Sequence, residues 1–177
     1  MSIPELVGIC SRDEQLRFLV IGGYAVIAHG YARFTHDLDF LIRRQQREQW
    51  VKKLKAVGFI NFVHRQNFIQ VSALSGGVDL DLMLVNDATF NQMWAEAKSI
   101  SFGDVEARMT CLDHLLALKL HVIKQGLVHR IDKDKDDVKM LVRKNSLNIR
   151  SRRYQELFLK YGTAAIYEEV VETAGRR

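Results

Sequence analysis

The stretch VIGGYAVIAHGYARFTHDLDFLI, residues 20–42, decides the fold. It starts within a wholly apolar run, residues 18–23, that ends in two glycines and is therefore typical of a buried strand. The Ala-rich segment that follows, residues 24–30, is predicted to be a helix, whose free backbone N–H groups favour a phosphate. In the later DLDFLIRR, carboxylates and apolar residues alternate with a period of two, which predicts a strand. Asp37 and Asp39 therefore project from one face of this strand.

A second acidic strand repeats this pattern in VDLDLMLV, residues 78–85, where Asp79 and Asp81 are again two residues apart. If the two acidic strands are neighbours, three carboxylates converge, and such hard oxygen ligands suit Mg²⁺ and two-metal phosphoryl transfer. Each part also has an ordinary explanation, because a glycine pair commonly forms only a tight turn and an acidic strand can be the solvated edge of a sheet. The apolar run at residues 40–42 and the repetition of the pattern argue against a solvated edge.

The rest of the chain separates into a mixed part and a helical part. Helical spacing of apolar residues predicts helices at residues 3–17, 45–58 and 88–98, and shorter apolar runs predict strands at residues 59–65, 67–74 and 105–109. From residue 111 onward the pattern is only helical. We therefore predict an α/β (α+β) fold, in which residues 1–110 form a mixed sheet flanked by helices and residues 111–177 form a helical C-terminal extension packed on that core.

The positive charge is concentrated in the last third of the chain. The net charge is +5, yet residues 1–110 hold 12 basic and 12 acidic side chains, so the whole excess lies in residues 111–177. Residues 139–160 contain only one acid, Glu156, but seven of these basic residues: Lys139, Arg143, Lys144, Arg150, Arg152, Arg153 and Lys160. Such a run is either a solvated helix face or a surface for a phosphate backbone. We favour contact with nucleic acid.

Several classes of protein are excluded by what the sequence lacks. Two cysteines without a C-x-x-C pair cannot staple a chain of 177 residues, and the histidines do not have the spacing of zinc ligands. No G-x-S-x-G segment indicates a serine hydrolase. The N-terminus lacks the features of a signal peptide, and no apolar run approaches the ~20 residues that a membrane span needs. We expect a cytoplasmic protein without a membrane partner.

The order of these motifs resembles that of a known family. A glycine pair, a short helix and then R-x-T-x-D-h-D-h (h, apolar) is similar to the core motif of the polymerase-β-like nucleotidyltransferase superfamily. Within it, the sequence most resembles the minimal bacterial nucleotidyltransferases of the AbiEii toxin type, over residues 18–142. The later part of the likeness is the run LALKLHVIKQGLVHRIDKDKDDVKML, with its lysine and K-D-x-x-D pattern.

The resemblance implies a role for each matching residue. Gly22 and Gly23 would hold the nucleotide phosphates, and Asp37 and Asp39 would ligate two metal ions. The third carboxylate, Asp81 or else Asp79, would complete the metal site and help to deprotonate the acceptor hydroxyl. Lys119 would contact the triphosphate, and four further residues would surround the cleft: Arg130, Lys133, Asp134 and Asp137. Arg33 and Thr35 either position a phosphate or cap the sheet.

The resemblance also implies an activity. The expected reaction is transfer of a nucleoside monophosphate from an NTP to an acceptor hydroxyl, with two Mg²⁺ ions, or Mn²⁺, as cofactor. RNA, such as a tRNA end, or a protein is the expected acceptor, and the chain would then be a toxin with an antitoxin as partner. Two alternatives stay open. The acceptor can be a small molecule such as an antibiotic, or the fold can be an inactive binding module.

Overall fold

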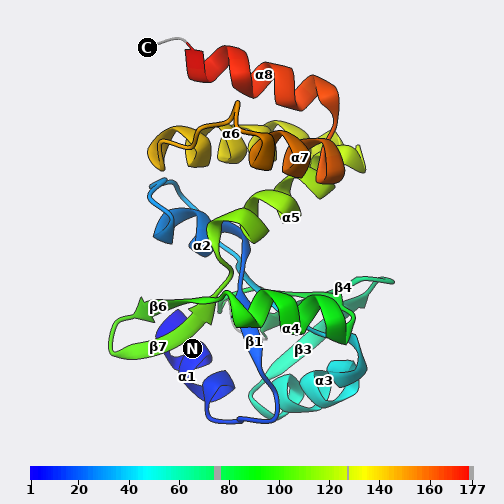
Figure 1. Cartoon of the computed structure of the whole chain (residues 1–177). Coiled ribbons are helices and arrows are strands. Elements are labelled where there is room, and N and C mark those ends of the chain that lie inside the picture. Colours follow the sequence, from blue (N-terminus) through cyan, green and yellow to red (C-terminus); the bar gives the residue numbers. More distant parts are fainter. Residues whose placement is uncertain (74–76, 127, 176–177) are drawn as a thin grey trace. The chain divides into compact units, whose positions relative to one another are not determined.

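The computed structural model describes residues 1–73, 77–126 and 128–175, without the side chains of 128–130 and 175. It confirms the predicted fold class, a mixed sheet with flanking helices and a C-terminal helical segment (Figure 1). The chain divides into two compact units. We call residues 1–25 and 33–111 the sheet unit, and residues 26–32 with those from 112 onward the helical unit.

The described part of the sheet unit contains one seven-stranded sheet in the order β3-β4-β5-β2-β1-β7-β6. Its strands are β1 (Phe18–Val20), β2 (Leu38–Arg43), β3 (Phe59–His64), β4 (Phe68–Ala73), β5 (Leu80–Val85), β6 (Lys98–Phe102) and β7 (Val105–Met109). β2 runs parallel to β5 and β1 runs parallel to β7, whereas the other neighbouring pairs are antiparallel. The two acidic strands of the sequence, β2 and β5, are therefore direct neighbours.

One face of the sheet carries the main hydrophobic core. Alternate residues of β2 and β5, among them Phe40 and Leu82, are fully buried there. Helices α1 (Ile3–Ser11) and α3 (Arg47–Ala56) lie on this same side (Figure 1). The Trp50 ring of α3 meets the stacked Phe18 and Phe40 rings edge-on, with centroid distances of 5.8 and 6.2 Å. Burial of aromatic side chains of this size contributes strongly to the stability of such a core.

The opposite face is covered in part by helix α4 (Asp87–Ala95), which packs against β2. Asn86 caps this helix, because its Oδ1 accepts a hydrogen bond of 2.8 Å from the Thr89 backbone N–H. The Arg43 guanidinium lies 4.1 Å from the centre of the Phe90 ring of α4. Arg43 belongs to the set of β2 residues that faces away from the main core. The carboxylates of β2 and β5 lie on this second face, as described below.

The helical unit consists of α5 (Leu112–Lys124), α6 (Val128–Lys144), α7 (Arg152–Tyr161), α8 (Ala164–Gly175) and residues 26–32. Residues 26–28 are the second half of α2 (Gly22–Ala28), a helix that both units share. Two hydrogen bonds hold residues 26–32 to α6. The Tyr31 hydroxyl donates to Asp136 over 2.6 Å, and the Asn145 side-chain amide donates to the His29 carbonyl over 2.9 Å.

The structure corrects the predicted elements at two places. Residues 98–102 form strand β6, which pairs with β7, whereas the sequence pattern predicts a helix that ends at residue 98 and no strand at residues 99–102. The predicted helix at residues 3–17 ends at Ser11 instead. There the Asp13 side chain accepts a hydrogen bond of 3.1 Å from the Gln15 backbone N–H, and such an Asx turn competes with continuation of the helix.

Candidate active site

Asp39 of β2 and Asp81 of β5 form the centre of the candidate site. The two residues are partners in the register of the parallel pair, so their side chains project from the same face of the sheet. Neighbouring strands lie about 4.8 Å apart, which brings the two carboxyl groups close together. Asp81 is buried and Asp39 is half-buried. Two carboxylates held side by side on rigid strands are the kind of donor set that a hard divalent cation requires.

Asp37 and Asp79 lie one residue before β2 and β5, respectively. Both are exposed, and the Leu38 backbone N–H donates to the Asp79 carbonyl over 3.0 Å. The resemblance implies Asp81, or else Asp79, as the third carboxylate. Of the two, Asp81 is the buried residue and the register partner of Asp39.

The glycine turn after β1 packs directly on Asp39. The Ile21 backbone N–H donates to the Asp39 carbonyl over 3.0 Å, and Gly22 follows with a φ of +60°. A Cβ atom on Gly22 would lie only 1.9 Å from Oδ2 of Asp39. Residue 22 therefore has to be glycine for two separate reasons, its left-handed backbone and the carboxylate that occupies the space of a side chain.

Gly23 has a similar relation to Thr35. A Cβ atom on Gly23 would lie 2.2 Å from Oγ1 of Thr35, so the threonine hydroxyl occupies the space that a side chain at position 23 would need. The turn therefore has a hydroxyl beside it, although that hydroxyl comes from the segment before β2. Arg33, from the same segment, donates from Nη1 to the Phe34 carbonyl over 3.0 Å.

Lys119 lies in the helical unit and is almost completely buried. Its ammonium group donates to Oδ1 of Asp134 over 2.6 Å and forms an ion pair of 2.7 Å with Oδ2 of Asp137. Both carboxylates belong to α6 and lie three residues apart, so they face α5 together. This cluster, Lys119–Asp134–Asp137, links the two helices through a buried network of charges. The predicted contact between Lys119 and a triphosphate stays a prediction.

Two further predicted cleft residues lie on α6. Lys133 is exposed. The side chain of Arg130 lies outside the described residues.

The basic segment of the helical unit is partly neutralised by its own surroundings. Lys139 forms an ion pair of 2.5 Å with Glu169 of α8, Arg152 pairs with Glu156 over 2.7 Å, and Arg153 pairs with Asp113. Lys135 also binds Glu169, at 2.9 Å, and these two lysines lower the pKa of that carboxyl by donating hydrogen bonds to it.

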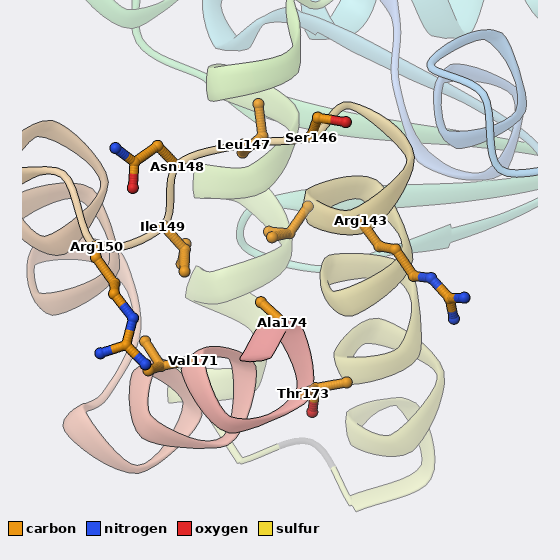
Figure 2. Close-up of a pocket in the computed structure, with 10 residues that line it drawn as sticks. Arg143, Ser146, Leu147, Asn148, Ile149, Arg150, Val171, Thr173 and Ala174 are labelled. Carbon is orange, nitrogen blue, oxygen red and sulfur yellow. The ribbon is translucent and has the colours of Figure 1, made fainter. Parts of the chain in front are cut away.

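Four cations of this segment, Arg143, Lys144, Arg150 and Lys160, form no ion pair within the described part of the chain. Two of them, Arg143 and Arg150, line a cavity of about 550 Å³ between the loop after α6 and helix α8 (Figure 2). Figure 2 shows their guanidinium groups on opposite sides of this cavity. Arg143, Lys144 and Arg150 all lie at or just after the C-terminal end of α6.

The comparisons with known proteins agree with the fold. No protein-family model and no curated protein sequence matches the chain. Among solved structures, the antibiotic-resistance factor ANT(2'')-Ia matches with a TM-score of 0.64 and 12% identity, over 98% of this chain and 95% of that one. An antigenic nucleotidyltransferase-like protein from Paracoccidioides brasiliensis matches with a TM-score of 0.57 and 14% identity, over 97% and 89%. The lincosamide antibiotic adenylyltransferase LnuA matches with a TM-score of 0.54 and 18% identity, over 80% and 98%.

The chain therefore has the polymerase-β-like nucleotidyltransferase fold. Within the described residues, no helix has the length and apolar character to cross a membrane.

One polar residue next to the carboxylates is not predicted from the sequence. Gln70 of β4 is the register partner of Asp81, so it extends the row of Asp39 and Asp81 by one strand. The signal in the sequence is that Gln70 stands between two apolar residues, Ile69 and Val71, in the segment FIQVSA.

Proposed function

We propose that this chain transfers a nucleoside monophosphate from an NTP to a hydroxyl group of a small molecule. The observation that carries the proposal is the pairing of Asp39 with Asp81 on adjacent parallel strands, with the Gly22 turn packed on Asp39. This arrangement offers adjacent carboxylate oxygens beside a turn that has no side chain to fill the space. An NTP triphosphate with its divalent cation fits that combination of chemistry.

The donor set fits Mg²⁺, because carboxylate oxygens are its preferred protein ligands. Asp37, Asp39 and Asp81 would hold the ions, which neutralise charge on the phosphates and stabilise the attacking and leaving oxygens. The proton transfer involves a residue of the chain itself. The Asp81 carboxylate accepts the proton of the acceptor hydroxyl, whose oxygen forms a bond to the α-phosphorus. The bond from that phosphorus to the bridging oxygen then breaks, and pyrophosphate leaves.

The turn at Gly22 and Gly23 is the proposed binding place for the triphosphate. Thr35 lies against Gly23, and its hydroxyl can donate to a phosphate oxygen there. Asp39 is fixed both by its strand and by the turn. A carboxylate that is already held in this position needs little reorganisation to bind a cation.

Two observations favour a small-molecule acceptor. ANT(2'')-Ia, which has this fold, is known in complex with adenylyl-2''-tobramycin, and LnuA is a lincosamide adenylyltransferase. In addition, the cations Lys139, Arg152 and Arg153 are paired with carboxylates of the helical unit, which lowers the charge that remains for a phosphate backbone. An RNA acceptor is the second candidate, and the unpaired Arg143, Lys144 and Arg150 are its specific support.

The test combines nucleotide binding with turnover. Wild-type protein, Asp39→Asn and Asp81→Asn are titrated with each NTP and Mg²⁺ in a calorimeter, and pyrophosphate release is followed with a panel of hydroxyl compounds. We expect Mg²⁺-dependent binding by the wild type and loss of pyrophosphate release in both variants. Asp104→Asn is the matched control, because Asp104 is an exposed aspartate of the sheet unit away from β2 and β5. If the wild-type protein binds no NTP, the chain is better described as an inactive binding module.

A further inference from the structure

The row of polar residues does not end at the carboxylates. Asp39, Asp81 and Gln70 are consecutive register partners on β2, β5 and β4, so all three side chains project from one face of the sheet. On the next strand, Val63 is the partner of Gln70 and Asn61 is the partner of Ser72. These four residues, Asn61, Val63, Gln70 and Ser72, form what we call the hairpin shelf.

The hairpin shelf is open to solvent in the sheet unit. Gln70 and Asn61 are exposed, and 45% of Val63 is accessible. The Asn61 side-chain amide donates to Oγ of Ser72 over 3.3 Å, which fixes these two groups relative to each other. The Gln70 amide has no hydrogen-bond partner in the described part of the chain, so both its donor and its acceptor are available. The main core lies on the other face, where Ile69 and Val71 are fully buried.

The shelf is also free of charge. β3 reads FINFVH and β4 reads FIQVSA, so neither strand contains Asp, Glu, Lys or Arg. Arg65 is in the turn beyond the strands. A surface that binds a polycationic acceptor is expected to carry carboxylates, and one that binds a phosphate backbone is expected to carry lysine or arginine. Amide and hydroxyl groups around one aliphatic side chain instead match the hydroxyl groups and ring carbons of a neutral, sugar-like molecule.

We propose that the hairpin shelf binds a neutral polyhydroxylated acceptor and that Gln70 positions the reacting hydroxyl against Asp81. This inference rests on the nucleotidyl transfer proposed above and adds the class of acceptor. Gln70 is a positioning residue in this scheme. Its amide binds a hydroxyl next to the one that reacts, and Asp81 accepts the proton from the reacting hydroxyl.

The first experiment compares acceptors. Wild-type protein, NTP and Mg²⁺ are incubated with neutral methyl glycosides and nucleosides, with tobramycin as a polycation, and with an RNA oligonucleotide that has a free 3'-hydroxyl. Nucleotidylated products are measured by mass spectrometry. We expect neutral compounds to be modified most efficiently. If only tobramycin or RNA is modified, or if no neutral compound is, the shelf does not have this role. Absence of Mg²⁺-dependent NTP binding would instead refute the nucleotidyl transfer itself.

The second experiment tests Gln70 directly. Gln70→Leu removes one neutral hydrogen-bonding group, and we expect the KM for the best neutral acceptor to rise about threefold to tenfold while the KM for NTP stays unchanged. Gln70→Glu places a negative charge beside the acceptor, so tobramycin is expected to gain efficiency relative to neutral compounds. Gln66→Leu is the matched control, because Gln66 is an exposed glutamine in the turn of the same hairpin. An acceptor KM of Gln70→Leu equal to that of Gln66→Leu would overturn the positioning role.

Discussion

Replacing Gly22 with alanine tests the contact between the glycine turn and the carboxylate site. The new Cβ would lie 1.9 Å from Oδ2 and 2.4 Å from Cγ of Asp39, whereas Cβ contacts in proteins are essentially never shorter than 3.0 Å. The carboxyl group would therefore have to move by about 1 Å. A displacement of that size in a catalytic group is expected to reduce the rate by roughly 100-fold. Alanine at a positive φ adds a stability cost of about 1–2 kcal/mol.

Gly103 provides a matched control for the backbone cost. Its φ is +62°, against +60° for Gly22, and a Cβ atom there would meet nothing within 4 Å. Gly103→Ala should therefore lose a similar amount of stability, about 1–2 kcal/mol, without any change at the carboxylates. The difference between the two variants isolates the effect of moving Asp39.

Binding of Mn²⁺, followed by electron paramagnetic resonance, measures this difference without knowledge of the acceptor. We expect Gly22→Ala to bind Mn²⁺ roughly 10- to 100-fold more weakly than Gly103→Ala, because the ligand is displaced. Urea unfolding of both variants checks the shared backbone cost. Equal Mn²⁺ affinities for the two variants would refute the idea that the glycine turn holds Asp39 in place for a metal ion.

Three further predictions follow from contacts described above. Gly23→Ser should reduce turnover, because its Cβ would lie 2.2 Å from Oγ1 and 2.7 Å from Cβ of Thr35. Adding Thr35→Gly removes both atoms and should restore part of the turnover, with the new serine hydroxyl in place of the threonine hydroxyl; a double variant no better than Gly23→Ser would contradict this. Lys119→Met leaves two buried carboxylates without their ammonium partner, so urea unfolding should show a free energy of unfolding lower by about 3–5 kcal/mol. A decrease below 1 kcal/mol would mean that the cluster is not buried in solution. Glu169→Gln should lower the melting temperature at pH 7. Folding lowers the pKa of Glu169, so its stabilisation of the fold is present above its ordinary pKa of 4.5 and disappears as the pH falls through the pKa of the folded state. The melting temperatures of variant and wild type should therefore converge in acid. A gap that stays constant with pH would contradict the ion pairs with Lys135 and Lys139.

Short-range patterns predicted much of the sheet unit. The period of two in β2 and β5 indicated which residues face one side, and that inference needs only the alternation of side chains along a strand. The pattern could not supply the register of β2 against β5, which makes Asp39 the partner of Asp81. Register depends on packing across the whole sheet, and a shift by one residue would turn every side chain to the other face.

Contacts between distant segments were beyond the reach of sequence reasoning. The spacing of Asp134 and Asp137 predicts that they share one face of α6, yet nothing in that spacing shows that Lys119 of α5 inserts between them. Strand β6 was overlooked for a related reason. It is short and mostly exposed, and it is defined by its pairing with β7 rather than by a strong pattern of its own.

The division of helix α2 between the two units has a consequence for dissecting the protein. Cleaving the chain after residue 111 would leave residues 26–32 on the wrong fragment, separated from α6, to which Tyr31 and His29 are hydrogen-bonded. The helical unit is thus not a module that can be removed or exchanged at a single junction. A recombination event or an engineer would have to move a seven-residue insert together with the C-terminal helices.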